Sequence, residues 1–291
     1  MAPTARKNGL RTAPPCRHVE EPWQEPEPAV VVLPLPGTPA AVCDTCPQPL
    51  ASDLLLVRRA VSGLPPLTLL APRDLDELAR YRWLVGHRAA FAVWHLQTHA
   101  LRSLADSSAP SPLAVEHTAF LYDVYCALLR HTGSCSARRY AATVRADMTA
   151  CHPAFSGEWA RDHAPVPELL RAVRARHPAP AVAPLTRAAR RSHRVHMEVA
   201  ERLVPGGRSL LQESGRCPGG TATPVELGLH DAFFGVVRHP VCERFFAAQL
   251  LRLVTRILCD PLPGGDPDAV RLLSRLAESL VPPHSGGPHG R

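Results

Sequence analysis

The chain has almost no lysine, isoleucine or asparagine, since each occurs once, at Lys7, Ile257 and Asn8. One lysine among 33 basic residues leaves 32 arginines. The scarce residues have AT-rich codons, whereas the abundant Ala, Pro, Arg and Gly have GC-rich codons, so a GC-rich gene explains the bias. A scattered arginine therefore indicates little about function, whereas a cluster of arginines without acids remains informative.

The sequence also lacks an uncharged apolar run long enough to span a bilayer, because its most apolar segment, 245–259, contains Arg252 and Arg256. Residues 1–28 are polar and proline-rich, which argues against a secretory signal. We therefore expect an intracellular protein in a reducing compartment, the cytoplasm or nucleus. Its nine cysteines are then thiols or metal ligands rather than disulfides.

Catalytic signatures are missing as well. The sequence contains no Gly-rich phosphate loop, no paired metal-binding carboxylates, no nucleophile elbow and no His-Glu-x-x-His helix. We therefore expect a protein that is not an enzyme.

What the sequence does have is helical periodicity. Apolar residues recur at spacings of three and four from Leu75 to Leu104, which predicts one long helix over 74–105. Asp74 with Glu77, and Thr223 with Glu226, have the spacing of capping boxes at helix starts. No alternation of strands with helices occurs, so we predict an all-α fold, an irregular multi-helix bundle.

The organisation along the chain follows from proline and glycine. We expect residues 1–50 to form a proline-rich arm, extended and partly disordered, in which 29–33 is the only segment with the character of a strand or docking element. Further helices are expected over 136–151, 224–238 and 240–259. The predicted units are a helical core (51–177), a linker (178–185), C-terminal helices packing on the core, which can form one continuous domain with it (186–281), and a disordered tail (282–291).

The net charge of +7 comes from one stretch, 169–197, which has no carboxylate. It contains Arg171, Arg174, Arg176, Arg187, Arg190, Arg191 and Arg194. Such a surface suits the phosphates of a nucleic acid, a nuclear-import receptor or an acidic protein face. The alternative is a solvated helix face enlarged by the coding bias.

Two groups of residues have the chemistry of zinc ligands. The first is Cys126, His131, Cys135 and Cys151, which lie at or near helix ends. The alternative is that Cys126 is a buried thiol and that His131 complements the helix dipole. The second is Cys16, His18, Cys43 and Cys46, which contains the only Cys-x2-Cys of the chain. Its alternative is a solvated pair in a mobile arm. We expect no organic cofactor and retain zinc as an option.

The coding bias, the proline-rich ends and the many cysteines are similar in general style to accessory proteins of large DNA viruses with GC-rich genomes. The rival source is a GC-rich bacterium. We expect a non-catalytic regulatory or scaffold protein that acts through a protein partner, in the host cell if the protein is viral, and whose oligomeric state the sequence leaves open. The first alternative is a nucleic-acid-binding regulator that uses 171–194 and is stabilised by zinc. A third hypothesis is a zinc-dependent enzyme built on Cys126, His131 and Cys135.

Overall fold

The computed structural model describes residues 30–281, apart from positions 39–40, 42, 44–45, 47, 49, 65–70, 218 and 261–265. The longer helices are α1 (Leu50–Val61), α2 (Leu75–Asp106), α3 (Pro112–Thr132), α6 (Pro165–Arg176), α7 (Ala183–Leu203), α9 (Pro224–Phe233), α10 (Glu243–Cys259) and α11 (Pro267–Ser279). The shorter ones are α4 (Ala137–Tyr140), a π-helical segment (Ala141–Arg145), α5 (Ala146–Cys151), a 3-10 turn (Gly157–Trp159) and α8 (Leu210–Glu213). The short strands are β1 (Val31–Leu33) and β2 (Val236–Arg238). The predicted all-α class is confirmed.

None of the helices within the described residues is long and apolar enough to cross a membrane. The predicted disorder of 1–29 and of 282–291 lies outside the described residues.

Helix α2 is the long helix that the apolar spacing predicts. It begins after Asp74, whose side chain accepts hydrogen bonds from the backbone N–H groups of Asp76 and Glu77. Its 32 residues extend about 48 Å at 1.5 Å per residue. It packs against α3, α6 and α10, so it is buried on several sides.

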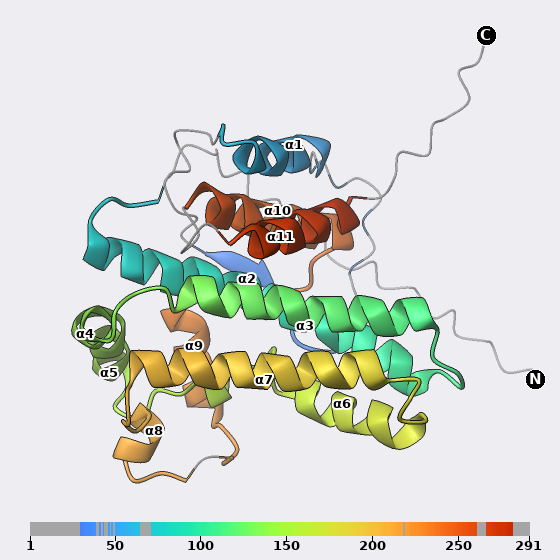
Figure 1. Cartoon of the computed structure of the whole chain (residues 1–291). Helices are drawn as coiled ribbons and strands as arrows, with labels where there is room; N and C mark the ends of the chain where they lie inside the picture. The colour runs from blue at the N-terminus through green and yellow to red at the C-terminus, as the bar shows by residue number, and fades with distance from the viewer. Residues whose placement is uncertain are drawn as a thin grey trace, which may run out of the picture.

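The helices lie in layers around α2 (Figure 1). Helix α3 packs between α2 and α7, while α6 contacts α2. Helix α1 packs on α10, and α11 contacts α1, α3 and α10. One hydrophobic core joins residues from both sides of the segment 178–185, in which Val182 and Leu185 are themselves buried.

A small parallel sheet joins the start of the described chain to its last third by backbone hydrogen bonds. Val31 of β1 pairs with Val236 of β2, and a further bridge joins Ala41 to Cys242. The predicted helix 224–238 is therefore too long. Helix α9 ends at Phe233 because Gly235 takes a positive φ of 59°, and its carbonyl accepts the N–H of Val31. Glycine adopts a positive φ readily and so allows this turn between α9 and β2, but the spacing of apolar residues does not predict it.

Candidate functional site

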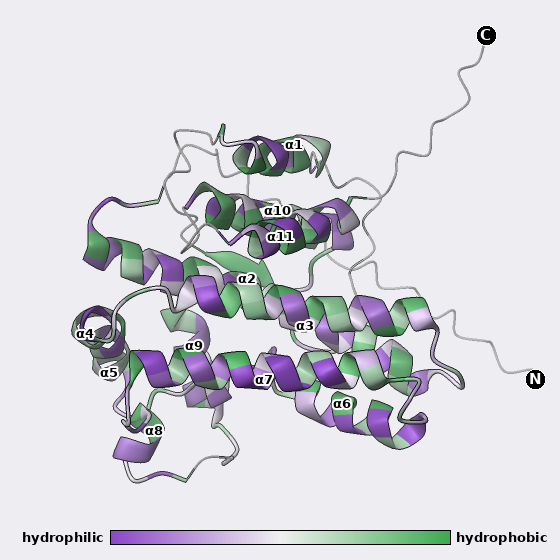
Figure 2. Cartoon of the chain, in the orientation of Figure 1, coloured by the Kyte–Doolittle hydropathy of each residue, from purple (hydrophilic) through white to green (hydrophobic). Residues whose placement is uncertain are grey.

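The arginines of 169–197 lie on the exposed faces of two helices. Arg171, Arg174 and Arg176 are exposed on α6, and Arg187, Arg190 and Arg194 are exposed on α7. Figure 2 shows hydrophilic segments alternating with apolar ones along α7, as expected of a helix with one buried face. Arg191 differs from the others because it forms an ion pair with Asp123 of α3. The partner of this arginine surface stays a prediction.

The first predicted zinc group is dispersed. Cys126 is buried near Ser192 of α7, whereas His131 is buried near Asp260 at the end of α10. Cys135 lies close to Tyr140, and Cys151 ends α5. Among the described residues, the ligand atoms of these four do not gather within metal-binding distance of one another.

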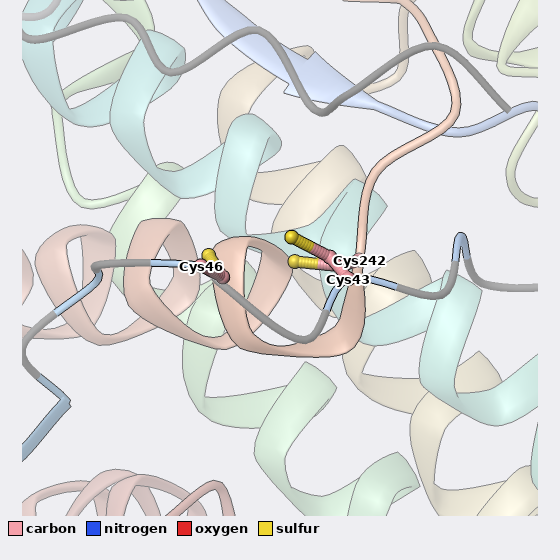
Figure 3. Close-up of side chains that lie close together, drawn as sticks. All are labelled: Cys43, Cys46 and Cys242. Carbon is pink, nitrogen blue, oxygen red and sulfur yellow. The ribbon is translucent and has the colours of Figure 1, made fainter. Parts of the chain in front are cut away.

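Two cysteines of the second predicted zinc group lie close together, and a third cysteine that the sequence spacing did not predict lies beside them. Cys43 and Cys46 lie together with Cys242, with the three sulfur atoms within 4.8 Å of one another (Figure 3). Cys16 and His18 lie outside the described residues.

The interior of the molecule contains a feature that sequence spacing did not predict, which we name the histidine–aromatic cluster. It comprises Trp83, His87, Phe91 and Trp94 of α2, Phe155, His163, His196 of α7, His230 of α9 and Phe234.

Ring contacts link the members of this cluster. The His87 ring stacks on Phe234 at a centroid distance of 4.7 Å and lies 4.3 Å from Trp83. His163 lies 4.8 Å from Trp94. His196 lies close enough to His87 and His163 to lower the pKa of each. Segments distant in the sequence therefore place His87, His163 and His230 among aromatic rings, with His196 near the first two.

Burial keeps these histidines uncharged at neutral pH. It lowers the pKa of His87 and of His163 to about 4, and that of His230 to about 3. Desolvation by neighbouring atoms also lowers the pKa of His196, although this residue is exposed. Neutral imidazole can accept a proton or bind a metal through its lone pair.

An ion-pair network holds one side of the cluster in place. Arg238 of β2 donates hydrogen bonds to Asp162 at 2.8 Å and to Asp231 at 2.6 Å. Both carboxylates are buried, and each is adjacent in sequence to a histidine of the cluster, His163 or His230. Because β2, α9 and the segment before α6 meet at one guanidinium, the network fixes the relative positions of those histidines.

A second buried imidazole belongs to His131 at the end of α3. Both of its ring nitrogens are buried without a hydrogen-bond partner, and Nε2 lies 3.7 Å from Oδ2 of Asp260. Asp260 also receives two hydrogen bonds from Arg82, at 2.6 and 2.7 Å. His131 lines a cavity of about 250 Å³ together with Arg130, Arg202 and Asp266.

Comparison with known proteins identifies an enzyme family. The sequence profile described as SfmD 3-methyl-L-tyrosine peroxygenase matches residues 36–193, more than half of the 291 residues. The search of curated proteins found no match. The matched range contains His87, His131 and His163.

The match corrects the functional expectations drawn from composition. A peroxygenase is an enzyme, so the expectation of a non-catalytic regulatory or scaffold protein is wrong. The alternative, a nucleic-acid-binding regulator, is wrong for the same reason. The style of a viral accessory protein and a role in host–virus interaction have no support either. The expected cofactor set omitted haem, on which the peroxygenases of this family depend.

Proposed function

Because the chain belongs to the SfmD 3-methyl-L-tyrosine peroxygenase family, we propose that it is a haem-dependent peroxygenase that transfers oxygen from a peroxide to a phenolic amino acid. The observation that carries the proposal within the molecule is the histidine–aromatic cluster. It supplies the two things that a haem protein must provide, namely a neutral imidazole ligand and an apolar surface for a flat ring system.

His87 is the residue that would best hold the haem iron. Its Nδ1 lies 2.7 Å from the carbonyl oxygen of Trp83. A carbonyl can only accept a hydrogen bond, so Nδ1 carries the proton and Nε2 presents a lone pair. Metal-binding histidines commonly donate their other N–H to a backbone carbonyl in this way, which fixes the orientation of the ring.

The surroundings of His87 suit a planar cofactor. Trp83, Phe91 and Phe234 contact its ring, with centroids 4.3, 6.0 and 4.7 Å away. The ring nevertheless retains accessible surface, and His163 and His196 do so as well. We infer that haem, when bound, would lie against these accessible imidazole rings.

Haem, when bound, supplies the redox chemistry that cleaves the oxygen–oxygen bond of the peroxide. The contribution of His163 and His196 is proton transfer. Both imidazoles have lowered pKa values and are neutral at pH 7, so each could hold or release a proton at a ring nitrogen.

The aromatic members of the cluster contribute binding. Trp94 and Tyr125 are buried against each other, whereas Trp83 and His163 retain accessible ring surface against which a phenol ring could stack. Stacking of this kind favours an aromatic substrate over an aliphatic one.

His131 is the second residue that could hold the haem iron. Two unpartnered buried nitrogens are costly unless something binds them. However, its side chain has no accessible surface. The cavity beside it, at about 250 Å³, is below the range of about 300–1,000 Å³ for small-molecule sites. We therefore favour His87.

Haem titration of the purified protein tests the cofactor and its ligand. The wild type should bind haem with a shifted Soret band, and His87→Ala should weaken the affinity by about tenfold or more. His117→Ala, at an exposed position of α3, is the matched control and should bind like the wild type. Loss of haem in His131→Ala but not in His87→Ala would move the axial ligand to His131. A wild type that binds no haem would overturn the proposal.

The reaction is tested with isotopically labelled hydrogen peroxide and two phenols, 3-methyl-L-tyrosine and L-tyrosine. The haem-loaded protein should yield a hydroxylated product that carries oxygen from the peroxide. Product whose new oxygen comes from dioxygen, or the absence of any hydroxylated product, would contradict a peroxygenase activity on this substrate class.

A further inference from the structure

A cluster of three thiols lies at the N-terminus of α10. Cys43 and Cys46 come from the segment between β1 and α1, and Cys242 is the residue that caps α10, about 200 positions later. Figure 3 shows the Cys43 and Cys242 side chains extending side by side toward Cys46, beside the first turn of this helix. Every pair of their sulfur atoms lies within 4.8 Å.

Contacts that do not involve sulfur bring the two segments together. The N–H of Ala41 donates to the carbonyl of Val241 at 3.0 Å, and Ala41 forms a parallel bridge with Cys242. On the other side of the cysteines, Arg244 donates to the carbonyl of Gln48 at 2.9 Å. The backbone is therefore held on both sides of the Cys-x2-Cys pair, so the thiols are positioned before any ligand arrives.

A hydrogen bond at the start of α10 holds the Cys242 sulfur in place. This sulfur accepts a hydrogen bond from the backbone N–H of Phe245 at 3.4 Å. Its position at the first turn of the helix is therefore fixed by the fold.

We propose that Cys43, Cys46 and Cys242 bind one zinc ion. Zn–S bonds of about 2.3 Å in a tetrahedral arrangement place sulfur atoms about 3.8 Å apart, which agrees with the observed limit of 4.8 Å. Three sulfur ligands select a soft or borderline metal such as zinc over magnesium or calcium. Cys46 and Cys242 are buried and Cys43 is half-buried, so the three sulfur ligands are largely shielded from solvent.

A zinc ion here would have a structural effect. It would tie the segment that follows β1 to the start of α10, close to the β1–β2 pairing. A disulfide can join only two of the three sulfurs, whereas a metal uses all of them, and this is why we favour zinc.

Metal analysis of the full-length protein, purified in a reducing buffer without chelators, tests the site. The wild type should contain about one zinc per chain, and Cys43→Ser, Cys46→Ser and Cys242→Ser should each contain at least tenfold less. Cys217→Ser is the control, because this exposed cysteine lies outside the cluster, and it should retain the zinc.

Cobalt substitution guards against loss of zinc through misfolding of a variant. The reduced, metal-free wild type should bind cobalt with thiolate charge-transfer bands, and Cys217→Ser should do the same. A wild type with neither zinc nor such bands would overturn the proposal. A chain two hydrogens lighter under non-reducing conditions, with normal mass in Cys242→Ser, would replace the metal by a disulfide. None of these measurements involves haem, so this proposal and the proposed function can fail independently.

Discussion

A side chain of one hydrogen atom at Gly86 lets α2 and α3 approach closely. A Cβ atom built at this position would lie 2.0 Å from Oγ1 and 3.0 Å from Cβ of Thr132. The Thr132 hydroxyl has little freedom to move, because it donates to the carbonyl of Leu128 at 2.7 Å. Glycine at this position therefore sets the spacing of the two helices and, with it, the position of the neighbouring His87.

We expect Gly86→Ala to destabilise the protein by about 1–3 kcal/mol through overpacking, as measured by urea unfolding. Adding Thr132→Ala should recover part of the loss, because it removes the nearer of the two atoms. The matched control is Gly228→Ala in α9, where a Cβ meets nothing within 4 Å and should stabilise the helix by about 1 kcal/mol. Equal effects at both glycines would contradict a steric role for position 86.

At the scale of single residues, the sequence predicts the role of a side chain well when that side chain contacts residues close to it in the chain. Asp74 and Thr223 cap their helices as their spacing indicates. The close approach at Gly86 depends on Thr132 of another helix, and a glycine in a helical pattern does not identify the residue that it will face. The metal-ligating role suggested for Cys126 depended on distant partners, and the structure places those partners elsewhere.

Among the elements, β2 has the greatest influence on the proposed active site. Its last residue, Arg238, joins Asp162 and Asp231, and Arg161 donates a further hydrogen bond to Asp231 at 2.9 Å. The Arg238 side chain is only 13% exposed and that of Asp162 1%, so solvent does little to screen the pair. Removing the guanidinium would leave two buried carboxylates close together.

We expect Arg238→Ala to lower the free energy of unfolding by about 3–5 kcal/mol, because breaking a buried ion pair leaves an uncompensated charge. Arg238→Lys should restore only part of this, since an ammonium cannot form both paired contacts. The control is Arg271→Ala, whose pair with Asp268 is more than 70% exposed on both sides and should contribute less than about 1 kcal/mol. Denaturant unfolding of the four proteins provides the comparison.

Elements whose partners are local could be predicted, and those whose partners are remote could not. The spacing of apolar residues gave α2, and it gave α10 within a few residues of its observed ends. The sequence predicts strand character at 29–33, but it predicts that the partner strand, 236–238, is the end of a helix. Pairing across 205 positions depends on the tertiary fold, which no local pattern contains.

For the molecule as a whole, buried neutral histidines should make the fold sensitive to acid. Burial lowers the pKa values of His87, His131 and His163 to about 4, and that of His230 to about 3, from an ordinary value of 6.5. Between pH 4 and 6.5 the unfolded chain therefore binds protons that the folded chain does not. Stability contributed by these groups is present above pH 6.5 and is lost as the pH falls toward 4. Asp53, whose pKa burial raises to about 6, and Asp162, whose pKa burial also raises, act in the opposite direction, but they are fewer than the histidines with lowered pKa values.

We expect the free energy of unfolding of the haem-free protein to fall between pH 7 and pH 5. Each of these histidines contributes a slope of at most about 1.4 kcal/mol per pH unit. His230→Gln should reduce the slope, whereas His117→Gln, at an exposed position, should change it less. Urea titrations at pH 7, 6 and 5 measure it. Stability that is constant or rises toward pH 5 would contradict the burial of neutral imidazoles.

The proposed haem site shows why function was harder to infer than fold. Its histidines, at positions 87, 163, 196 and 230, share no spacing and lie on separate elements. The only signal in the sequence was their number, 15 in the chain. Helical periodicity is a local property, whereas a site assembled from four segments exists only once the helices have packed.

The pairing of Val31 with Val236 also has a consequence for synthesis on the ribosome. The strand that emerges first has its partner 205 residues later, and translation at about 5–20 residues per second delays that partner by about 10–40 s. During this interval Val31 and Leu33, which end up buried, have no sheet to join. The nascent chain therefore depends on its own early helices, or on a chaperone, to protect an apolar strand until the last third of the polypeptide has been made.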